Sequence, residues 1–288
     1  MIAELQDSTW VVLLRTDNLT TYFKLFPIFG KPAFYVFVFA AWFWLKGGKN
    51  CIFFVFAALF ASVANGLLKI AIQIPRPPAE IHLINAGSFG FPSGDAQLVA
   101  TMFFLFAFFY GRISLFILAL LLTLNSMLSR VYLGVHSPLD VMVGASLGFL
   151  TAYAFSRPVI YELITNWALG RNLRTYWGFV GACTLIAFGL YFSLVSTPLA
   201  IALGSLYGLG VAFTTGKLHK TRNTSPYVVL VSITTLAILY IVFPSTFISG
   251  PYSWANEIAE FFFLTLFIFH YAPRLFDAVK KDRTLRHV

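Results

Sequence analysis

Charge is what this sequence has least of. Of its 288 residues, 11% are charged and 59% are hydrophobic, whereas a soluble domain usually carries about 25% charged residues. A soluble chain of this length could bury a large core, but it would still need a polar coat. Because the sequence has too few polar residues for that coat, it excludes a soluble enzyme and a disordered chain. We expect a lipid bilayer to cover most of the surface.

Cysteine is also scarce. The two cysteines, Cys51 and Cys183, both lie within apolar runs. They are too few for a disulfide framework, so we expect them to be packing residues. Residues 1–26 lack the charged start, apolar stretch and cleavage site of a signal peptide. Their mixture of apolar and charged residues predicts an amphipathic segment that lies in the membrane interface.

Long apolar runs dominate the rest of the chain. A transmembrane helix needs about 20 mostly apolar residues, and about nine runs approach that length. They lie at roughly 27–45, 50–72, 95–110, 113–129, 138–156, 176–194, 197–214, 226–244 and 255–272. Barrel strands are about ten residues long and alternate in polarity, which these runs do not. We therefore predict an all-α fold, a polytopic membrane bundle of about nine transmembrane helices.

One long polar break, at residues 157–175, divides the predicted helices. Nearly all the chemically unusual residues are N-terminal to this break, and the predicted helices C-terminal to it are plain and apolar. We expect an interfacial segment at 1–26, a helical core at 27–156, and additional helices with a basic tail at 157–288.

Positive charge exceeds negative charge, with a net charge of +9 and a pI of about 9.6. In a membrane protein such an excess collects in cytoplasmic loops, so we expect no nucleic-acid partner. Most of the 20 basic residues, including the C-terminal tail, fall on one side when alternate loops are compared. We expect an integral protein of a bacterial cytoplasmic membrane whose C-terminus is cytoplasmic. Lys69, Arg76 and Arg130 are exceptions near helix ends on the extracytoplasmic side.

Three segments on that outer side hold the residues that topology does not explain. They are Lys69 to Pro78 (KIAIQIPRPP), Gly90 to Gln97 (GFPSGDAQ) and Ser129 to Asp140 (SRVYLGVHSPLD). Charged groups at membrane depth are costly and indicate a functional site. Ser93 and Gly94 open a helix, whose N-terminus offers unpaired N–H groups to an anion. With two arginines and a lysine nearby, this helix end predicts a phosphate site.

His136 and Asp140 are four residues apart, and Ser137 and Pro138 between them suit the first turn of a helix. We expect Ser137 to cap that helix and Asp140 to reach back to the imidazole. A carboxylate on one ring nitrogen fixes the tautomer and leaves the other nitrogen as a nucleophile or base. A lone histidine is more often just a satisfied polar residue. The three segments together favour a functional interpretation.

The motifs resemble those of the type 2 phosphatidic acid phosphatase (PAP2) superfamily, Lys-x6-Arg-Pro, Pro-Ser-Gly-His and Ser-Arg-x5-His-x3-Asp. Over about residues 1–156, the resemblance implies a membrane-embedded phosphatase core that acts on lipid phosphates or diphosphates at the extracytoplasmic face, without a metal ion or other cofactor. It implies that His136 attacks phosphorus to form a phosphohistidine and that Asp140 orients His136. It also implies a phosphate-binding set, namely Lys69, Arg76, Ser93, Gly94 and Arg130.

Asp95 departs from this pattern, because the family has a histidine there that protonates the leaving group and activates water. A carboxyl group is a stronger acid than an imidazolium, with reference pKa values of about 3.9 and 6.5. Three interpretations stay open: Asp95 is a working catalytic acid, the leaving group is a phosphate that needs little acid, or the enzyme is weakened. His82 is a further candidate for the missing acid.

The sequence therefore predicts hydrolysis of a lipid phosphate or diphosphate monoester. The alternatives are a non-catalytic or weakened protein that binds or moves a lipid phosphate, and a lipid phosphotransferase. Glu80 and His82 lie in the loop over the predicted site. Two interpretations stay open: these residues contact the head group of the substrate, or they belong to a solvated loop. Tyr132 is expected at the lipid entrance or in the aromatic belt of the interface.

Overall fold

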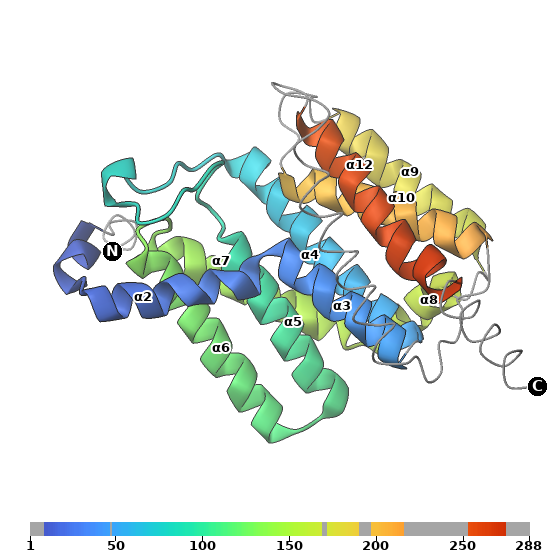
Figure 1. The fold of residues 1–288 in the computed structure, drawn as a ribbon, viewed down its shortest axis with the longest axis horizontal. Helices are drawn as coiled ribbons and strands as arrows, with labels where there is room; N and C mark the ends of the chain where they lie inside the picture. The colour runs from blue at the N-terminus through green and yellow to red at the C-terminus, as the bar shows by residue number, and fades with distance from the viewer. Residues whose placement is uncertain (1–8, 47, 169–171, 190–196, 216–252, 275–288) are drawn as a thin grey trace, which may run out of the picture. The chain divides into compact units, whose positions relative to one another are not determined.

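The computed structural model describes residues 9–46, 48–168, 172–189, 197–215 and 253–274. Every regular element in these ranges is helical, which confirms the predicted all-α fold. The longer helices are α2 (Asp17–Leu25), α3 (Pro32–Lys46), α4 (Lys49–Ile72), α5 (Gly94–Tyr110), α6 (Ile113–Tyr132), α7 (Pro138–Phe155), α8 (Pro158–Ala168), α9 (Leu173–Gly189), α10 (Thr197–Thr215) and α12 (Ser253–Leu266). Short elements are η1 (Thr9–Leu14), η2 (Phe26–Gly30), η3 (Ala79–Ile81) and η5 (Phe267–Tyr271) (Figure 1).

Three of the described helices, α4, α6 and α7, are long and apolar enough to cross a membrane. A fourth span is added if the bent pair Asp17–Gly30 and Phe34–Lys46 counts as one, and Gly94–Tyr110 and Ala200–Thr214 are shorter apolar helices. The predicted run at 226–244 lies outside the described residues. The membrane bundle is thus present, whereas the total of nine spans stays a prediction.

The helices form two compact units. One comprises Met1–Tyr35 and Ala57–Tyr161, and the other comprises Val36–Phe56 and Glu162–Val288. Helices α3 and α4 therefore contribute residues to both. The domain boundaries predicted from the sequence, after residues 26 and 156, stay predictions. Packing differs from them by grouping Val36–Phe56 with the C-terminal helices.

Helix α5 is central to the first unit, where it packs against α6 and α7. It runs beside α6 down to the turn at Gly111, whose φ of 62° is in the left-handed region (Figure 1). Against α7 the two backbones nearly touch: a Cβ on Gly144 would lie 2.4 Å from the carbonyl oxygen of Ser93, and one on Gly148 would lie 2.3 Å from that of Gln97. Helix α7 therefore fixes where α5 begins.

Buried amides join the second half of α4 to α5. The side chain of Asn65 donates to the carbonyl of Pro92 at 3.2 Å and to Oε1 of Gln97 at 2.9 Å, and Gln97 donates to the carbonyl of Ala61. A buried polar group is costly unless it is hydrogen-bonded. This network therefore holds the segment before α5 in one register against α4.

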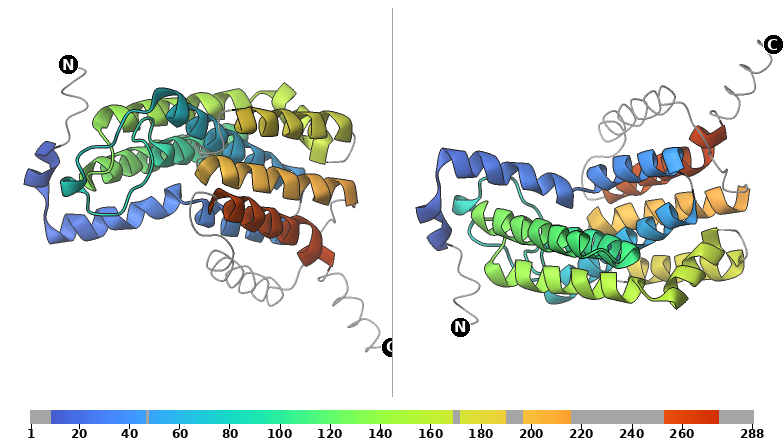
Figure 2. Two further views of the ribbon diagram at one scale, coloured as in Figure 1. Left: turned by 90° about the horizontal axis from the view of Figure 1, so that it is seen from above. Right: turned by 90° about the horizontal axis from the view of Figure 1, so that it is seen from below.

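The N-terminal elements pack along α6, which they approach near its C-terminal end. Ser129 donates its hydroxyl to the carbonyl of Phe23, and Tyr22 donates to Asn125. In Figures 1 and 2, η1 and α2 lie at the same end of this unit as the connection between α4 and α5. The predicted interfacial segment is thus helical at Thr9–Leu14 and again from Asp17, and its membrane location stays a prediction.

The polar break at residues 157–175 contains helix α8, which the apolar runs of the sequence did not predict. The apolar side chains of Ile164 and Trp167 are buried, whereas Glu162 is exposed. Within the second unit, Trp167 stacks on Phe179 with ring centroids 5.5 Å apart. Glu162 and Asn166 of this stretch therefore belong to an amphipathic helix.

Candidate active site

Helix α4 brings Lys69 to the site in its last turn. Its ammonium group donates to the carbonyl oxygens of Phe89 and Gly90, and its side chain is buried. Helix α4 ends at Ile72, and Gln73 follows with a φ of 54°. The chain therefore turns away immediately after the helix and places the Pro75–Pro78 segment against the loop that precedes α5.

Arg76 links that loop to the predicted nucleophile. Its Nε donates to the carbonyl oxygens of Gly87 and Ser88 at 3.0 and 3.1 Å. Its Nη1 donates to the carbonyl of Val135 at 2.8 Å and lies 3.0 Å from Nε2 of His136. Arginine has no acceptor atom, so in this contact Nε2 of His136 accepts. The proton of the neutral imidazole is therefore on Nδ1.

His136 and Asp140 meet as the sequence predicts. Nδ1 of His136 lies 3.3 Å from Oδ2 of Asp140, and both side chains are 2% exposed. Ser137 caps α7: its hydroxyl accepts from the backbone N–H of Asp140, and the Asp140 carboxylate accepts from the N–H of Ser137. This capping box confirms the predicted cap. It fixes the carboxylate that in turn fixes the imidazole.

Burial holds the pKa of His136 well below its usual value. The hydrogen bond with Asp140 acts against this shift, whereas the charges of Arg76, Arg130 and Lys69 reinforce it. The imidazole is therefore neutral at physiological pH, and its Nε2 lone pair is available for attack once the hydrogen bond from Arg76 is released. Burial and the nearby charge of Arg130 also lower the pKa of Arg76, to about 10, which leaves Arg76 charged at neutral pH.

Ser93 occupies the N-cap position of α5, but its hydroxyl does not cap the helix. Its backbone N–H donates to the carbonyl of Asp140 at 2.9 Å, which ties the start of α5 to α7. The hydroxyl oxygen is fully buried and has no hydrogen-bond partner in the described part of the chain. Because an unsatisfied buried polar group is costly, this position suits a ligand that supplies the missing partner.

Arg130 faces Asp95 across the site. Nη1 of Arg130 lies 2.9 Å from Oδ2 of Asp95, with exposed side-chain fractions of 7% and 19%. The two atoms are close enough for an ion pair, but their angles do not make a hydrogen bond. Nε and Nη1 of Arg130 thus have no hydrogen-bond acceptor among the described residues. A buried guanidinium with two unused donors can bind an anion with two oxygens.

Glycines contribute to the site in a way that the sequence did not reveal. A Cβ on Gly30 would lie 2.5 Å from Cγ of Asp95, so the Asp95 side chain packs directly on the backbone of η2. A Cβ on Gly90 would lie 3.2 Å from Oδ2 of Asp140 and 3.0 Å from the carbonyl of Pro75. Both glycines have ordinary backbone angles, and only the close approach of distant segments requires them.

Tyr132 does not line an entrance, contrary to one prediction. It is 5% exposed, and its hydroxyl contacts the backbone of Thr16 and the hydroxyl of Thr20. The N-terminal elements cover it because its ring also packs on Phe23, with centroids 4.6 Å apart. Tyr132 therefore joins the N-terminal segment to the helix that carries Arg130.

The structure thus brings together all the predicted site residues. Lys69, Arg76 and Arg130 supply positive charge, the N-terminus of α5 supplies N–H groups, and Ser93 supplies a free hydroxyl. No group of three or more histidine, cysteine, aspartate or glutamate side chains that could hold a metal ion occurs in the described ranges. The arrangement can bind a phosphoryl group and present a neutral imidazole to it.

Comparison with known proteins places the chain in one family. The sequence model of the PAP2 superfamily matches residues 50–163. Dolichyldiphosphatase of Saccharomyces cerevisiae is 30% identical over 189 residues, which are 57% of this chain and 74% of that protein. Lipid A 1-phosphatase of Rhizobium johnstonii is 30% identical, covering 41% of this chain and 54% of that protein. Lipid phosphate phosphatase gamma of Arabidopsis thaliana is 34% identical, covering 34% of this chain and 48% of that protein.

The match is thus spread over most of the yeast protein, whereas the chain spans about half the length of the other two relatives. A solved structure, the PAP2-type phosphatidylglycerolphosphate phosphatase of Bacillus subtilis, is 25% identical, with a TM-score of 0.47. The aligned region covers 51% of this chain and 80% of the Bacillus subtilis protein. The site lies almost wholly within the matched residues 50–163, and the chain belongs to the PAP2 superfamily and is a phosphatase of that type.

Proposed function

We propose that the protein hydrolyses a lipid phosphate or diphosphate monoester through a phosphohistidine, at the extracytoplasmic face of the membrane and without a metal ion. The observation that carries this proposal is the orientation of His136. Nδ1 faces Asp140, and Nε2 accepts from Arg76 among the unused donors of Ser93 and Arg130. An anion at those donors would lie where Nε2 can reach it.

The first step is attack by the Nε2 lone pair of His136 on phosphorus. A P–N bond forms, the bond between phosphorus and the leaving oxygen breaks, and the leaving oxygen carries away the electron pair. Positive charge from Lys69, Arg76 and Arg130 balances the charge on the phosphoryl oxygens, the part that metal ions play in other phosphoryl-transfer sites. Asp140 stabilises the imidazolium that results.

The second step is attack by water on the phosphohistidine. The water proton passes to a base, the P–N bond breaks, and inorganic phosphate leaves with His136 neutral again. We propose Asp95 as the acid and base, because its carboxylate lies at the start of α5 beside Arg130. To protonate an alkoxide in the first step, Asp95 must first take up a proton from water and give up its contact with Arg130. A diphosphate substrate does not need that proton, since its leaving phosphate has a pKa near 6.

Two alternatives use the same phosphate cradle, the cluster formed by the N-terminus of α5 with Lys69, Arg76, Ser93 and Arg130. A non-catalytic protein would bind the lipid phosphate and release no inorganic phosphate. A phosphotransferase would pass the phosphoryl group to a second lipid instead of water. Neither has a specific observation in its favour, and both are outcomes of the same experiment.

The test is a release assay on the purified protein in detergent, with 32P-labelled phosphatidic acid and prenyl diphosphate. We expect inorganic phosphate from the wild type and an acid-labile labelled protein after rapid quenching. His136→Ala should bind the lipid yet release no phosphate and carry no label. Binding without release by the wild type would contradict the proposal. A labelled second lipid would show a phosphotransferase.

A further inference from the structure

One arginine that precedes the matched residues 50–163 contacts two segments that carry the site. Arg15 lies between η1 and α2, and its side chain is half-buried. Its Nη2 donates to the carbonyl of Tyr132 at 3.2 Å and to the carbonyl of Ile81 at 2.5 Å. A single guanidinium therefore joins the N-terminal segment to the end of α6 and to η3, all within the first unit. Neither step of the proposed mechanism uses this side chain.

The bond to Tyr132 completes the hydrogen bonding at the end of α6. The last four carbonyl groups of a helix need partners from outside it. Backbone N–H groups just after α6 donate to three of the four, in the pairs Leu133–Ser129, Val135–Arg130 and Gly134–Val131. The fourth carbonyl, that of Tyr132, accepts from Arg15. The positive charge of Arg15 also suits the negative end of the helix dipole, so Arg15 is the C-terminal cap of α6.

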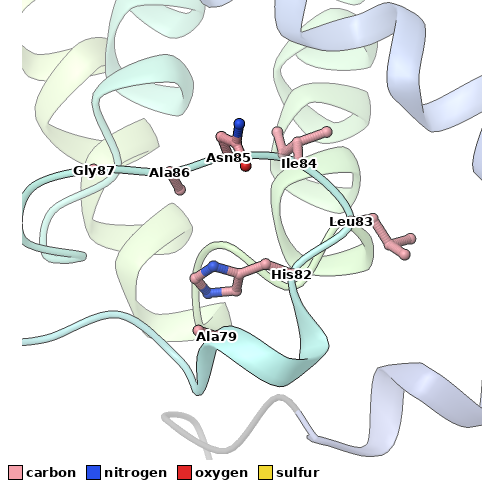
Figure 3. A pocket seen from close by; sticks show the side chains of 7 residues that line it. All are labelled: Ala79, His82, Leu83, Ile84, Asn85, Ala86 and Gly87. Atoms are coloured by element: carbon pink, nitrogen blue, oxygen red, sulfur yellow. The ribbon is translucent and has the colours of Figure 1, made fainter.

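The second acceptor, the carbonyl of Ile81, belongs to a loop that is itself held in place. In Figure 3 this η3 loop, residues Ala79 to Gly87, begins with the short helix η3 and continues as an arc. The N–H of Leu83 donates to the carbonyl of Leu133 at 2.9 Å, which ties the loop to the turn after α6. Because Ile81 is fixed in this way, its carbonyl holds the Arg15 guanidinium beside the end of α6.

Gly134 shows how closely these segments meet. Its φ of 75° is in the left-handed region, which glycine adopts without strain. A Cβ there would lie 2.1 Å from the carbonyl oxygen of Ile81 and 2.9 Å from Nη2 of Arg15. Closely packed interiors transmit displacements. A shift of the guanidinium would therefore be passed to the backbone that runs from Arg130 to His136.

Arg130 lies in the last turn of α6, two residues before Tyr132. Its unused donors can bind a phosphate only if that turn is correctly placed. We propose that Arg15 is a positioning residue of the phosphatase: by holding the carbonyl of Tyr132, it places the last turn of α6 and thereby Arg130 for phosphate binding. Arg15 itself does not contact the substrate. The proposal rests on the proposed function, because it takes Arg130 as a phosphate ligand.

The first test is steady-state kinetics with phosphatidic acid in mixed micelles. Arg15→Ala should lower kcat/KM about tenfold, since a displacement of about 1 Å caused by a distant substitution can cost up to about a hundredfold. Most of the loss should be a higher KM, because Arg130 contacts the phosphate before the reaction as well as during it. Arg15→Lys should stay within about threefold of the wild type, because both bonds start from one nitrogen and an ammonium has three donors. Equal losses in the two variants would overturn the proposal.

Tyr22→Phe is the matched control. The hydroxyl of Tyr22 donates to Oδ1 of Asn125 at 2.9 Å, so it also joins the N-terminal segment to α6, but upstream of Arg130. Loss of this bond should leave kcat/KM unchanged. If Tyr22→Phe lowers kcat/KM as much as Arg15→Ala does, any loosening of the N-terminal segment has the same effect, and the specific role of Arg15 is wrong.

A measurement that needs no turnover separates this proposal from the proposed function. Thermal unfolding of the full chain is measured with and without inorganic phosphate for the wild type, Arg15→Ala, Arg130→Ala and the double variant. We expect phosphate to raise Tm of the wild type more than that of Arg15→Ala. In the Arg130→Ala background, Arg15→Ala should leave the phosphate-induced rise unchanged, because Arg15 acts through Arg130.

Equal phosphate-induced rises in the wild type and Arg15→Ala would overturn the role of Arg15, and so would a further loss in the double variant. A rise in the wild type without phosphate release from any lipid would overturn only the hydrolytic function. If phosphate does not raise Tm of the wild type, the phosphate site and the role of Arg15 in it are both wrong.

Discussion

At the scale of single residues, the site depends on how Asp95 is held. Its carboxylate lies 2.9 Å from Nη1 of Arg130, and its side chain packs against the backbone of Gly30. These contacts confine the carboxylate to the edge of the phosphate cradle. A carboxylate in that place competes with a phosphate oxygen for Arg130, and it is also close enough to the cradle to accept a proton from water. Substitution separates these two roles.

Asp95→Asn keeps the size of the side chain and removes its charge and its basicity. We expect kcat to fall about a hundredfold, the usual contribution of a general acid or base, with phosphohistidine accumulating because its hydrolysis is slowed. Inhibition by inorganic phosphate should become stronger, because Arg130 is released. Steady-state kinetics and rapid-quench labelling measure both effects. Full turnover in Asp95→Asn across pH 4–8 would exclude Asp95 from the chemistry, and a gain of activity in Asp95→His would indicate a weakened enzyme.

His136 makes folding stability depend on pH. Burial lowers its pKa in the folded protein, so below the unfolded value of about 6.5 the unfolded chain binds a proton that the folded chain does not. Stability therefore falls as the pH is lowered from about 6.5, by on the order of 1 kcal/mol per pH unit. The decrease in stability between pH 7 and pH 5, measured by thermal unfolding in detergent, should be smaller for His136→Gln than for the wild type. Parallel curves for the two proteins would contradict this expectation.

At the scale of helices, the contact between α5 and α7 fixes the start of α5. Alanine normally stabilises a helix relative to glycine by about 1 kcal/mol, but a Cβ on Gly144 would lie 2.4 Å from the carbonyl of Ser93. Gly144→Ala should therefore push Ser93 out of place and lower kcat/KM at least tenfold. Gly181→Ala in α9 is the matched control, because a Cβ there meets nothing within 4 Å. Phosphate release assays on both variants test the difference, and equal activities would contradict it.

Local signals in the sequence were sufficient for most of the helices. Apolar runs bounded by Gly111, by Pro138 or by the proline-rich segment after Ile72 predicted helix ends within a few residues of those observed. Helix α8 was missed because its polar residues share the helix with the buried Ile164 and Trp167. A search for long apolar runs cannot find such an amphipathic helix, whereas helical periodicity would have indicated it.

The site shows the same division between local and distant information. The pairing of His136 with Asp140 and the cap at Ser137 depend on residues four apart, so the sequence predicted them. The contacts of Gly30 with Asp95 and of Tyr132 with Thr16 and Thr20 join residues far apart along the chain. Such contacts follow from helix packing, which one sequence does not determine.

At the scale of the whole molecule, the N-terminal segment is part of the enzyme although it precedes the matched residues 50–163. The hydroxyl of Tyr132 contacts Thr16 and Thr20, at the end of the helix that carries Arg130. Tyr132→Phe removes these hydrogen bonds and keeps the ring, so we expect a loss of stability of about 1 kcal/mol and a rise in KM. Thermal unfolding and kinetics check this, and Tyr110→Phe, at an exposed ring, is the control.

The orientation of the chain in the membrane determines on which side the phosphate is released. Helix α5 runs from the cradle at Ser93 to the turn at Gly111, and its 17 residues span about 25 Å at 1.5 Å each. The η3 loop and Arg112 should therefore lie at opposite membrane surfaces. We predict that Glu80 is extracytoplasmic and Arg112 cytoplasmic, because most basic residues outside the cradle fall on the side of Arg112.

Single cysteines at these two exposed positions test the orientation, after Cys51 and Cys183 have been replaced by alanine. In intact cells, a membrane-impermeant maleimide should label Glu80→Cys and leave Arg112→Cys unlabelled until the cells are permeabilised. Phosphatase activity of both variants, measured in detergent, is the control for folding. Labelling of Arg112→Cys alone in intact cells would indicate the opposite orientation, with the phosphate cradle at the cytoplasmic face. Soluble phosphorylated metabolites would then compete with the lipid for Arg76 and Arg130.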